Sequence, residues 1–179
     1  KLAMEMQAQG KYEEAEPLLR EALEVLRETL GNRHPETLCS IGNLGLLLQA
    51  KGDLAAAEPL FREALEGRRK TFGNRHLNTL ASISNLGTLL QAKADFATAE
   101  PLLREALKVC HKTLGDRHPN TLISINNLGM LLQAKGDLTA AEPLLREVLE
   151  VSRATLGDRH PNTLSSINNL GALLKAKGD

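Results

Sequence analysis

The sequence predicts an all-α solenoid, and three observations lead to that fold class. A 42-residue unit recurs along the chain, and about three quarters of residues 95–136 are unchanged in residues 137–178. Within each copy, apolar residues follow the spacing of one helix face. Glycine and aspartate return at fixed points between the apolar segments, where helices would end and begin.

The repeats define the expected domain organisation, a single array over residues 1–179. A partial copy at 1–10 precedes four full copies at 11–52, 53–94, 95–136 and 137–178. Lys1 lies inside a repeat, and Asp179 stands where another helix would begin. We therefore expect an array truncated at both ends from a longer chain.

The first helix of each helix pair begins at the residue after a histidine, which is proline in three copies and leucine in the other. Because the pair is read from this histidine, each 42-residue copy given above opens with the second helix of the preceding pair. In the third full copy, Pro119 fits the first helical position, where its missing N–H costs nothing. Leu122, Ile125 and Leu128 then fall on one face, and Gly136 fits a left-handed C-terminal cap. The four equivalent helices are expected at 35–51, 77–93, 119–135 and 161–177.

The second helix of each repeat follows at once, so the two helices must pack antiparallel. In the last copy Asp137 is its expected N-cap and Gly157 follows its end. Pro143 lies in its second turn and is expected to bend it. The expected ranges are 11–30, 53–72, 95–114 and 137–156, with a short piece before Gly10, giving nine helices and no strand.

Two further patterns concern packing rather than chemistry. Gly129 and Ala141, with their equivalents in the other copies, indicate close approach between helices. Glu142 and Arg146, four residues apart in the favourable order, predict an ion pair on a solvated outer face, repeated in each copy.

Composition excludes several classes of function. Lys and Arg total 22 and Asp and Glu total 22, which argues against nucleic-acid binding. No apolar run approaches the roughly 20 residues of a membrane span. We find no nucleophile–base pair, paired carboxylates or phosphate-binding loop, so no enzyme activity and no cofactor are expected. Cys39 and Cys110 occupy different phases and predict free thiols in a reducing, cytoplasmic compartment.

Four histidines, one before each first helix, could suggest a metal site. The expected distance between neighbouring repeats excludes it. Neighbours in the array should stand on the order of 10 Å apart, whereas Zn–N bonds are about 2.1 Å. We expect these histidines to cap helices, and no metal site. They are His34, His76, His118 and His160.

The spacing L-G-x-x-L-x-x-x-G-D-x-x-x-A, seen from Leu128 to Ala141, resembles the tetratricopeptide repeat. With the longer period and the motifs N-N-L-G, A-E-P-L and L-G-x-R-H-P, the chain resembles kinesin light chain repeats over its whole length. That resemblance implies a right-handed superhelical solenoid whose concave groove, lined by the first helices, binds peptide segments of partners. The sequence departs from kinesin light chains in lacking coiled-coil heptads and in the greater likeness of its copies.

Comparing the copies places a candidate peptide-binding face on the first helices, opposite their constant leucines. An asparagine recurs there without change, and a side-chain amide can hold a peptide backbone through both its donor and its acceptor. The recurring asparagines are Asn43, Asn85, Asn127 and Asn169. The variable neighbours are Leu46, Thr88, Met130 and Ala172, together with Ser84, Asn126 and Asn168. Further along the helices lie Gln49, Gln91, Gln133 and Lys175.

Two interpretations of this face remain open. In the first, the amides bind an extended peptide. In the second, the amides bond to a neighbouring helix, and the variable positions differ between copies because no ligand constrains them. The leading prediction is a protein–protein interaction scaffold, and the alternative is a structural spacer or self-assembling array without a peptide ligand. The last helix keeps the apolar residues Ile167, Leu170 and Leu174, so end-to-end self-association is also expected.

Overall fold

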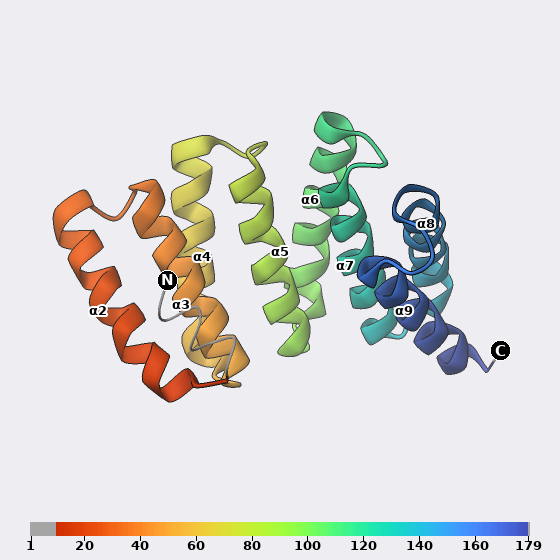
Figure 1. Ribbon diagram of the computed structural model, residues 1–179, viewed down its shortest axis with the longest axis horizontal. Coiled ribbons are helices and arrows are strands. Elements are labelled where there is room, and N and C mark those ends of the chain that lie inside the picture. Colours follow the sequence, from red (N-terminus) through yellow and green to blue (C-terminus); the bar gives the residue numbers. More distant parts are fainter. Residues whose placement is uncertain (1–9, 179) are drawn as a thin grey trace. The chain divides into compact units, whose positions relative to one another are not determined.

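A computed structural model describes residues 10–178 and is helical throughout that range apart from the connections (Figure 1). Its eight helices are α2 (Tyr12–Leu30), α3 (Pro35–Ala50), α4 (Leu54–Phe72), α5 (Leu77–Ala92), α6 (Phe96–Leu114), α7 (Pro119–Lys135), α8 (Leu138–Leu156) and α9 (Pro161–Lys177). The described part of the chain contains no strand. The all-helical prediction is confirmed, and each boundary lies within one residue of its expected place. The short helix expected before Gly10 lies outside the described residues.

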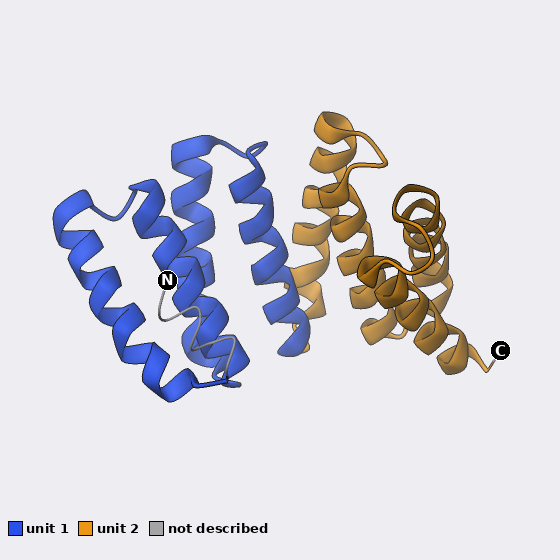
Figure 2. Ribbon diagram, in the orientation of Figure 1, with its two compact units in different colours: residues 1–93 blue, residues 94–179 orange. Residues whose placement is uncertain are grey.

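The chain divides into two compact units, residues 1–93 and 94–179 (Figure 2). In the first unit α2 packs on α3, α3 on α4 and α4 on α5. In the second, α6 packs on α7, α7 on α8 and α8 on α9. In each unit the two helices that follow a histidine also touch each other, α3 with α5 and α7 with α9.

Side-chain caps begin seven of the eight described helices, and α2, which follows Lys11, has none. In α4, α6 and α8 the carboxylate of the preceding aspartate accepts from a backbone N–H; the Asp53 Oδ1 to Ala56 N distance is 3.0 Å. The histidines before α3, α5, α7 and α9 are the N-caps of those helices. In each of them the Nδ1 atom accepts from the backbone N–H two residues later, at 3.1–3.3 Å. Their predicted role as caps is confirmed.

Glycine conformations separate the two kinds of helix end. Gly136 after α7 has φ +91° and ψ 2°, the predicted left-handed cap. Gly157 after α8 was also expected to adopt the left-handed α conformation of a C-terminal cap. Its φ is +84° but its ψ is 166°, which lies outside that region. The region that Gly157 does occupy is open essentially to glycine alone. The chain turns there into an extended link rather than continuing to coil, which brings the following histidine into capping position.

The predicted buried stripe is confirmed on α3, α5 and α7. Ile41, Ile83 and Ile125 are fully buried. Glycine at the contact matters, because a Cβ on Gly45 would stand 2.7 Å from the Phe61 ring of α4. The sequence pattern did not single out a leucine of the same helices that is equally buried in every copy, at Leu47, Leu89, Leu131 and Leu173.

The stripe on α9 differs from the others. Leu164 is 49% exposed, whereas its equivalent Leu38 is 1% exposed. Ile167 and Leu174 are half-buried, and a Cβ added to Gly171 would meet nothing within 4 Å. Among the described residues α8 covers Leu170, but no helix packs over the rest of this face.

The outer ion pairs form as predicted and carry an additional partner. Arg20 Nη2 lies 2.9 Å from Glu16 Oε1, and Lys51 Nζ, at the end of α3, lies 2.6 Å from Glu16 Oε2. The same arrangement recurs at Glu58, Glu100 and Glu142. Each glutamate therefore joins its own helix to the next one along the chain, and the outer face is not merely solvated.

Candidate functional site

The asparagines expected to form the candidate face are half-buried on α3, α5, α7 and α9. Asn43 Nδ2 lies 3.9 Å from Cys39 Sγ on the same helix. Among the described residues, the side-chain amides of Asn85 and Asn127 make no hydrogen bond. Asn169 differs, because its Nδ2 donates to Asn126 Oδ1 at 2.8 Å, joining α9 to α7.

The variable neighbours range from half-buried to exposed. Leu46 is 39% exposed, Ala172 is exposed, and Thr88 and Met130 are half-buried. Ser84 is half-buried and Asn168 exposed. Gln49, Gln91 and Gln133 are half-buried near the ends of their helices, while Lys175 at the same phase is exposed. The structure thus places the whole predicted set at least partly in reach of solvent.

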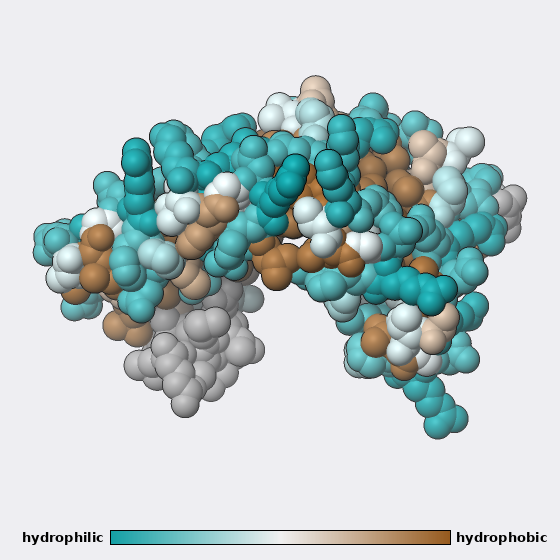
Figure 3. Space-filling view, turned by 90° about the horizontal axis from the view of Figure 1, so that it is seen from above, coloured by the Kyte–Doolittle hydropathy of each residue, from teal (hydrophilic) through white to brown (hydrophobic). Residues whose placement is uncertain are grey.

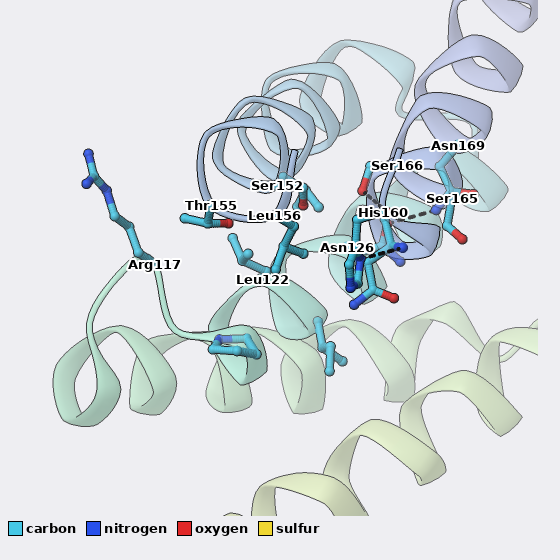
Figure 4. A pocket seen from close by; sticks show the side chains of 14 residues that line it. Arg117, Leu122, Asn126, Ser152, Thr155, Leu156, His160, Ser165, Ser166 and Asn169 are labelled. Carbon is cyan, nitrogen blue, oxygen red and sulfur yellow. Dashed lines mark hydrogen bonds between the residues drawn. The ribbon is translucent and has the colours of Figure 1, made fainter. Parts of the chain in front are cut away.

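In the second unit part of this face borders a cavity of about 590 Å³ (Figure 4). It lies among the start of α7, the end of α8 and the start of α9. Leu122, Ile123, Val148 and Leu156 provide apolar walls. The remaining lining residues are Arg117, Pro119, Asn126, Ser152, Thr155, His160, Asn162, Ser165, Ser166 and Asn169.

The close-up view separates the apolar and polar parts of the cavity. In Figure 4 Leu122 and Leu156 occupy the middle, Asn126, His160 and Asn169 gather on one side, and Arg117 stands away on its loop. The exposed fraction of Ile123 is 52%, high for an isoleucine. Such a mixture of apolar walls and a few polar groups is typical of a ligand pocket.

The first unit carries a charged residue that the comparison of first helices did not reveal. Arg68 of α4 places its Nη1 2.8 Å from Ser82 Oγ and 3.1 Å from the Asn78 carbonyl oxygen. Its Nη2 lies 3.4 Å from the Leu38 carbonyl oxygen. Burial lowers the pKa of Arg68, and no carboxylate among the described residues pairs with it. Comparing the second helices, where this phase reads Leu, Arg, Cys and Ser, would have revealed it.

The described residues offer little for other kinds of chemistry. They bring no three His, Cys, Asp or Glu side chains together as a metal would require. Cys39 is exposed and Cys110 buried, and neither forms a disulfide. No described helix is long and apolar enough to cross a membrane. Hydrophilic residues cover most of the face seen in Figure 3, with apolar residues in separate patches.

Solved structures with the same fold provide the comparison. A Podosopora anserina protein described as a kinesin light chain with nearly identical TPR-like repeats aligns with a TM-score of 0.83 and 32% identity. The alignment covers 99% of this chain and 84% of that one. A single-substitution variant of that protein aligns with a TM-score of 0.85 and 30% identity, over the same shares of the two chains. BtubC (BKLC) from P. vanneervenii aligns with a TM-score of 0.83 and 25% identity, covering 99% of this chain and 71% of that one.

The sequence itself matches a family model described as tetratricopeptide repeat. The matches span residues 1–70, 37–110, 78–150 and 123–179, which together cover the chain. No curated protein matches it. Repeats of this type generally mediate contacts between proteins, and their fold is a non-catalytic scaffold type. This chain belongs to the tetratricopeptide repeat family, and its fold is of the kinesin light chain-like type.

Proposed function

We propose that this chain is a scaffold that binds extended peptide or protein segments on its asparagine-bearing faces, those of α3 and α5 in the first unit and those of α7 and α9 in the second. The observation that carries the proposal is the state of the recurring amides. Asn85 and Asn127 are only half-buried, and neither side chain makes a hydrogen bond within the described part of the chain. A half-buried amide whose donor and acceptor are both unused can bond to a peptide backbone.

The neighbouring residues support the same function. Leu46 and Ile123 expose apolar surface beside the amides, at 39% and 52%. Residues of differing character next to a constant hydrogen-bonding group allow preference for particular side chains while the backbone contact stays the same. The Asn169–Asn126 bond leaves the amide nitrogen of Asn126 and the amide oxygen of Asn169 for a ligand.

The test selects peptides from a displayed library of random 12-residue segments and measures their affinity for the full chain and its variants. Asn85→Ala and Asn127→Ala should each weaken, about three- to tenfold, the binding of peptides held by the unit that carries the changed residue, because a neutral hydrogen bond contributes about 0.5–1.5 kcal/mol. Glu24→Ala, at an exposed site on α2, is the matched control. If both asparagine variants lower the unfolding midpoint and leave peptide affinity unchanged, the amides are structural and the proposal fails.

A second candidate function is end-to-end assembly with another copy of the chain. It is favoured by the exposed apolar face of α9, where Leu164 is 49% exposed and a Cβ added to Gly171 would meet nothing within 4 Å. At about 25 cal/mol per Å² of apolar surface, covering a few hundred Å² contributes several kcal/mol. Sedimentation over a wide concentration range tests it. Leu164→Glu should reduce association, and a wild-type chain that stays monomeric at every concentration rules assembly out.

A further inference from the structure

One position of the second helices carries an arginine in the first unit and a serine in the second. The residues around this position in one unit have direct equivalents in the other. Arg68 on α4 has its 84-residue equivalent in Ser152 on α8. The three groups that accept hydrogen bonds from Arg68 belong to Leu38, Asn78 and Ser82. Their equivalents in the second unit, Leu122, Asn162 and Ser166, all line the 590 Å³ cavity, as does Ser152 itself.

The guanidinium group of Arg68 therefore occupies, in the first unit, the space that is hollow in the second. Serine ends at its hydroxyl and lacks the further two methylenes and the guanidinium group that let arginine reach across, so Ser152 leaves that space open. The preceding residue has changed together with it. A Cβ on Gly67 would stand 2.3 Å from Leu38 Cδ2, whereas the equivalent Val151 carries a branched side chain.

The chemistry of the hollow indicates what it takes. Leu122, Val148 and Leu156 are apolar, and Ile123 extends the apolar surface to the opening. The lining contains no carboxylate and one permanently charged residue, Arg117. The unused amide groups of Asn126 and Asn169 lie at the rim. A charged or small side chain would leave these walls unmatched, whereas a bulky apolar one would cover them.

We propose that the cavity of the second unit is a specificity pocket for a bulky apolar side chain of a bound peptide. In the first unit, Arg68 fills the equivalent pocket. This inference rests on the proposed peptide-binding function and adds the position and chemistry of one anchor residue. The peptide backbone on either side of the anchor bonds to Asn126 and Asn169, and because the lining carries Arg117 and no carboxylate, neutral or acidic residues flank the anchor.

The probe for the test is a single capped amino acid, N-acetyl-leucine amide, with N-acetyl-alanine amide as the matched control. The full chain is labelled at its isoleucine δ1 methyl groups, which number five, at Ile41, Ile83, Ile123, Ile125 and Ile167. The leucine probe should shift the Ile123 signal in a saturable manner and leave Ile41 and Ile83 of the first unit unmoved. The alanine probe should bind at least fivefold more weakly.

Two variants close or weaken the pocket. The pair Val151→Gly and Ser152→Arg copies residues 67–68 of the first unit and should reduce leucine-probe affinity at least tenfold. Leu156→Ser removes apolar wall at a residue that is 42% exposed, so the fold tolerates it, and should reduce affinity about threefold or more. An Ile123 signal that does not respond to the leucine probe, or responds equally in the closed variant, overturns the pocket.

The same variants separate this inference from the broader proposal. If displayed peptides keep their affinity for the closed variant but lose it for Asn127→Ala, the peptide-binding face of the second unit stands and the pocket is overturned. If no displayed peptide is retained, the proposed function fails, and with it the assignment of a peptide anchor. Support requires that peptides selected on the wild-type chain share a bulky apolar residue. Changing that residue to alanine must weaken binding to wild type tenfold and leave binding to the closed variant unchanged.

Discussion

Single residues in this chain are best understood by comparing them with their equivalents 42 residues away. Gly45 and Gly171 occupy the same phase, yet a Cβ on Gly45 would lie 2.7 Å from the Phe61 ring and one on Gly171 would touch nothing. The sequence indicated close helix approach at both. It did not reveal that only one glycine is under a neighbouring helix in the described structure, because the pattern is identical.

That contrast yields a prediction about stability. Gly45→Ala should lower the free energy of unfolding by about 1 kcal/mol, because crowding of about 1–3 kcal/mol exceeds the gain of about 1 kcal/mol in helix propensity. Gly171→Ala should raise it by about 0.5–1 kcal/mol through propensity alone. Urea unfolding of the two variants measures both. A gain in Gly45→Ala equal to that in Gly171→Ala would show that Phe61 moves aside freely.

Ala94 differs from its equivalents because it stands where the other copies have glycine. Its φ is +59°, while the glycines at the same phase, Gly52 and Gly136, have φ +85° and +91°. A side chain in left-handed geometry costs about 1–2 kcal/mol. Ala94→Gly should therefore raise the unfolding free energy by about 0.5 kcal/mol after the extra chain entropy of glycine is subtracted. Ala81→Gly, at an exposed site within α5, is the control and should lower it; a loss in both variants would contradict the account.

At the scale of elements, the sequence determined nearly every helix. Proline, aspartate and glycine mark helix ends by local backbone chemistry, so the boundaries could be predicted to within a residue. The histidine caps followed from position alone. The bend expected at Pro143 and its equivalents stays a prediction. The connection between helices through Glu16 and Lys51 was not foreseen, because residues 35 positions apart meet only after the helices pack.

These connections predict a pH dependence. Hydrogen bonds from Lys51 first, and Arg20 second, lower the pKa of the Glu16 carboxylate, and Glu58, Glu100 and Glu142 have the same cause for a lowered pKa. A folded-state pKa below the unfolded value of about 4.3 stabilises the fold above that pH. This stabilisation is lost as pH falls through the folded-state pKa.

The measurement is the urea midpoint of unfolding between pH 6 and pH 3. It should fall with acid in the wild-type chain and fall less steeply in Lys51→Met, which removes one connection. Lys112→Met, at an exposed lysine of α6, is the matched control and should keep the wild-type slope. Equal slopes in all three chains would show that the connections contribute nothing measurable to stability.

For the whole molecule, the 42-residue period predicted the all-helical repeat fold, and the family match bears this out. The candidate face was predicted less completely. First helices carry the amides and could be compared directly, which found Asn126 and Asn169. The pocket walls Leu156 and Val148 and the blocking Arg68 come from second helices. Their approach to the first helices of neighbouring repeats depends on packing that the period does not specify.

The central claim is that peptides bind on the faces that carry the asparagines, and photo-crosslinking tests it most directly. Benzoylphenylalanine placed at Met130 of α7 should capture a peptide selected on the wild-type chain. The same group at Arg104, exposed on the outer face of α6, should not. Mass spectrometry of the crosslinked product identifies the joined residues. Capture from position 130 and none from 104 is the result predicted here; capture from 104 and none from 130 would contradict it.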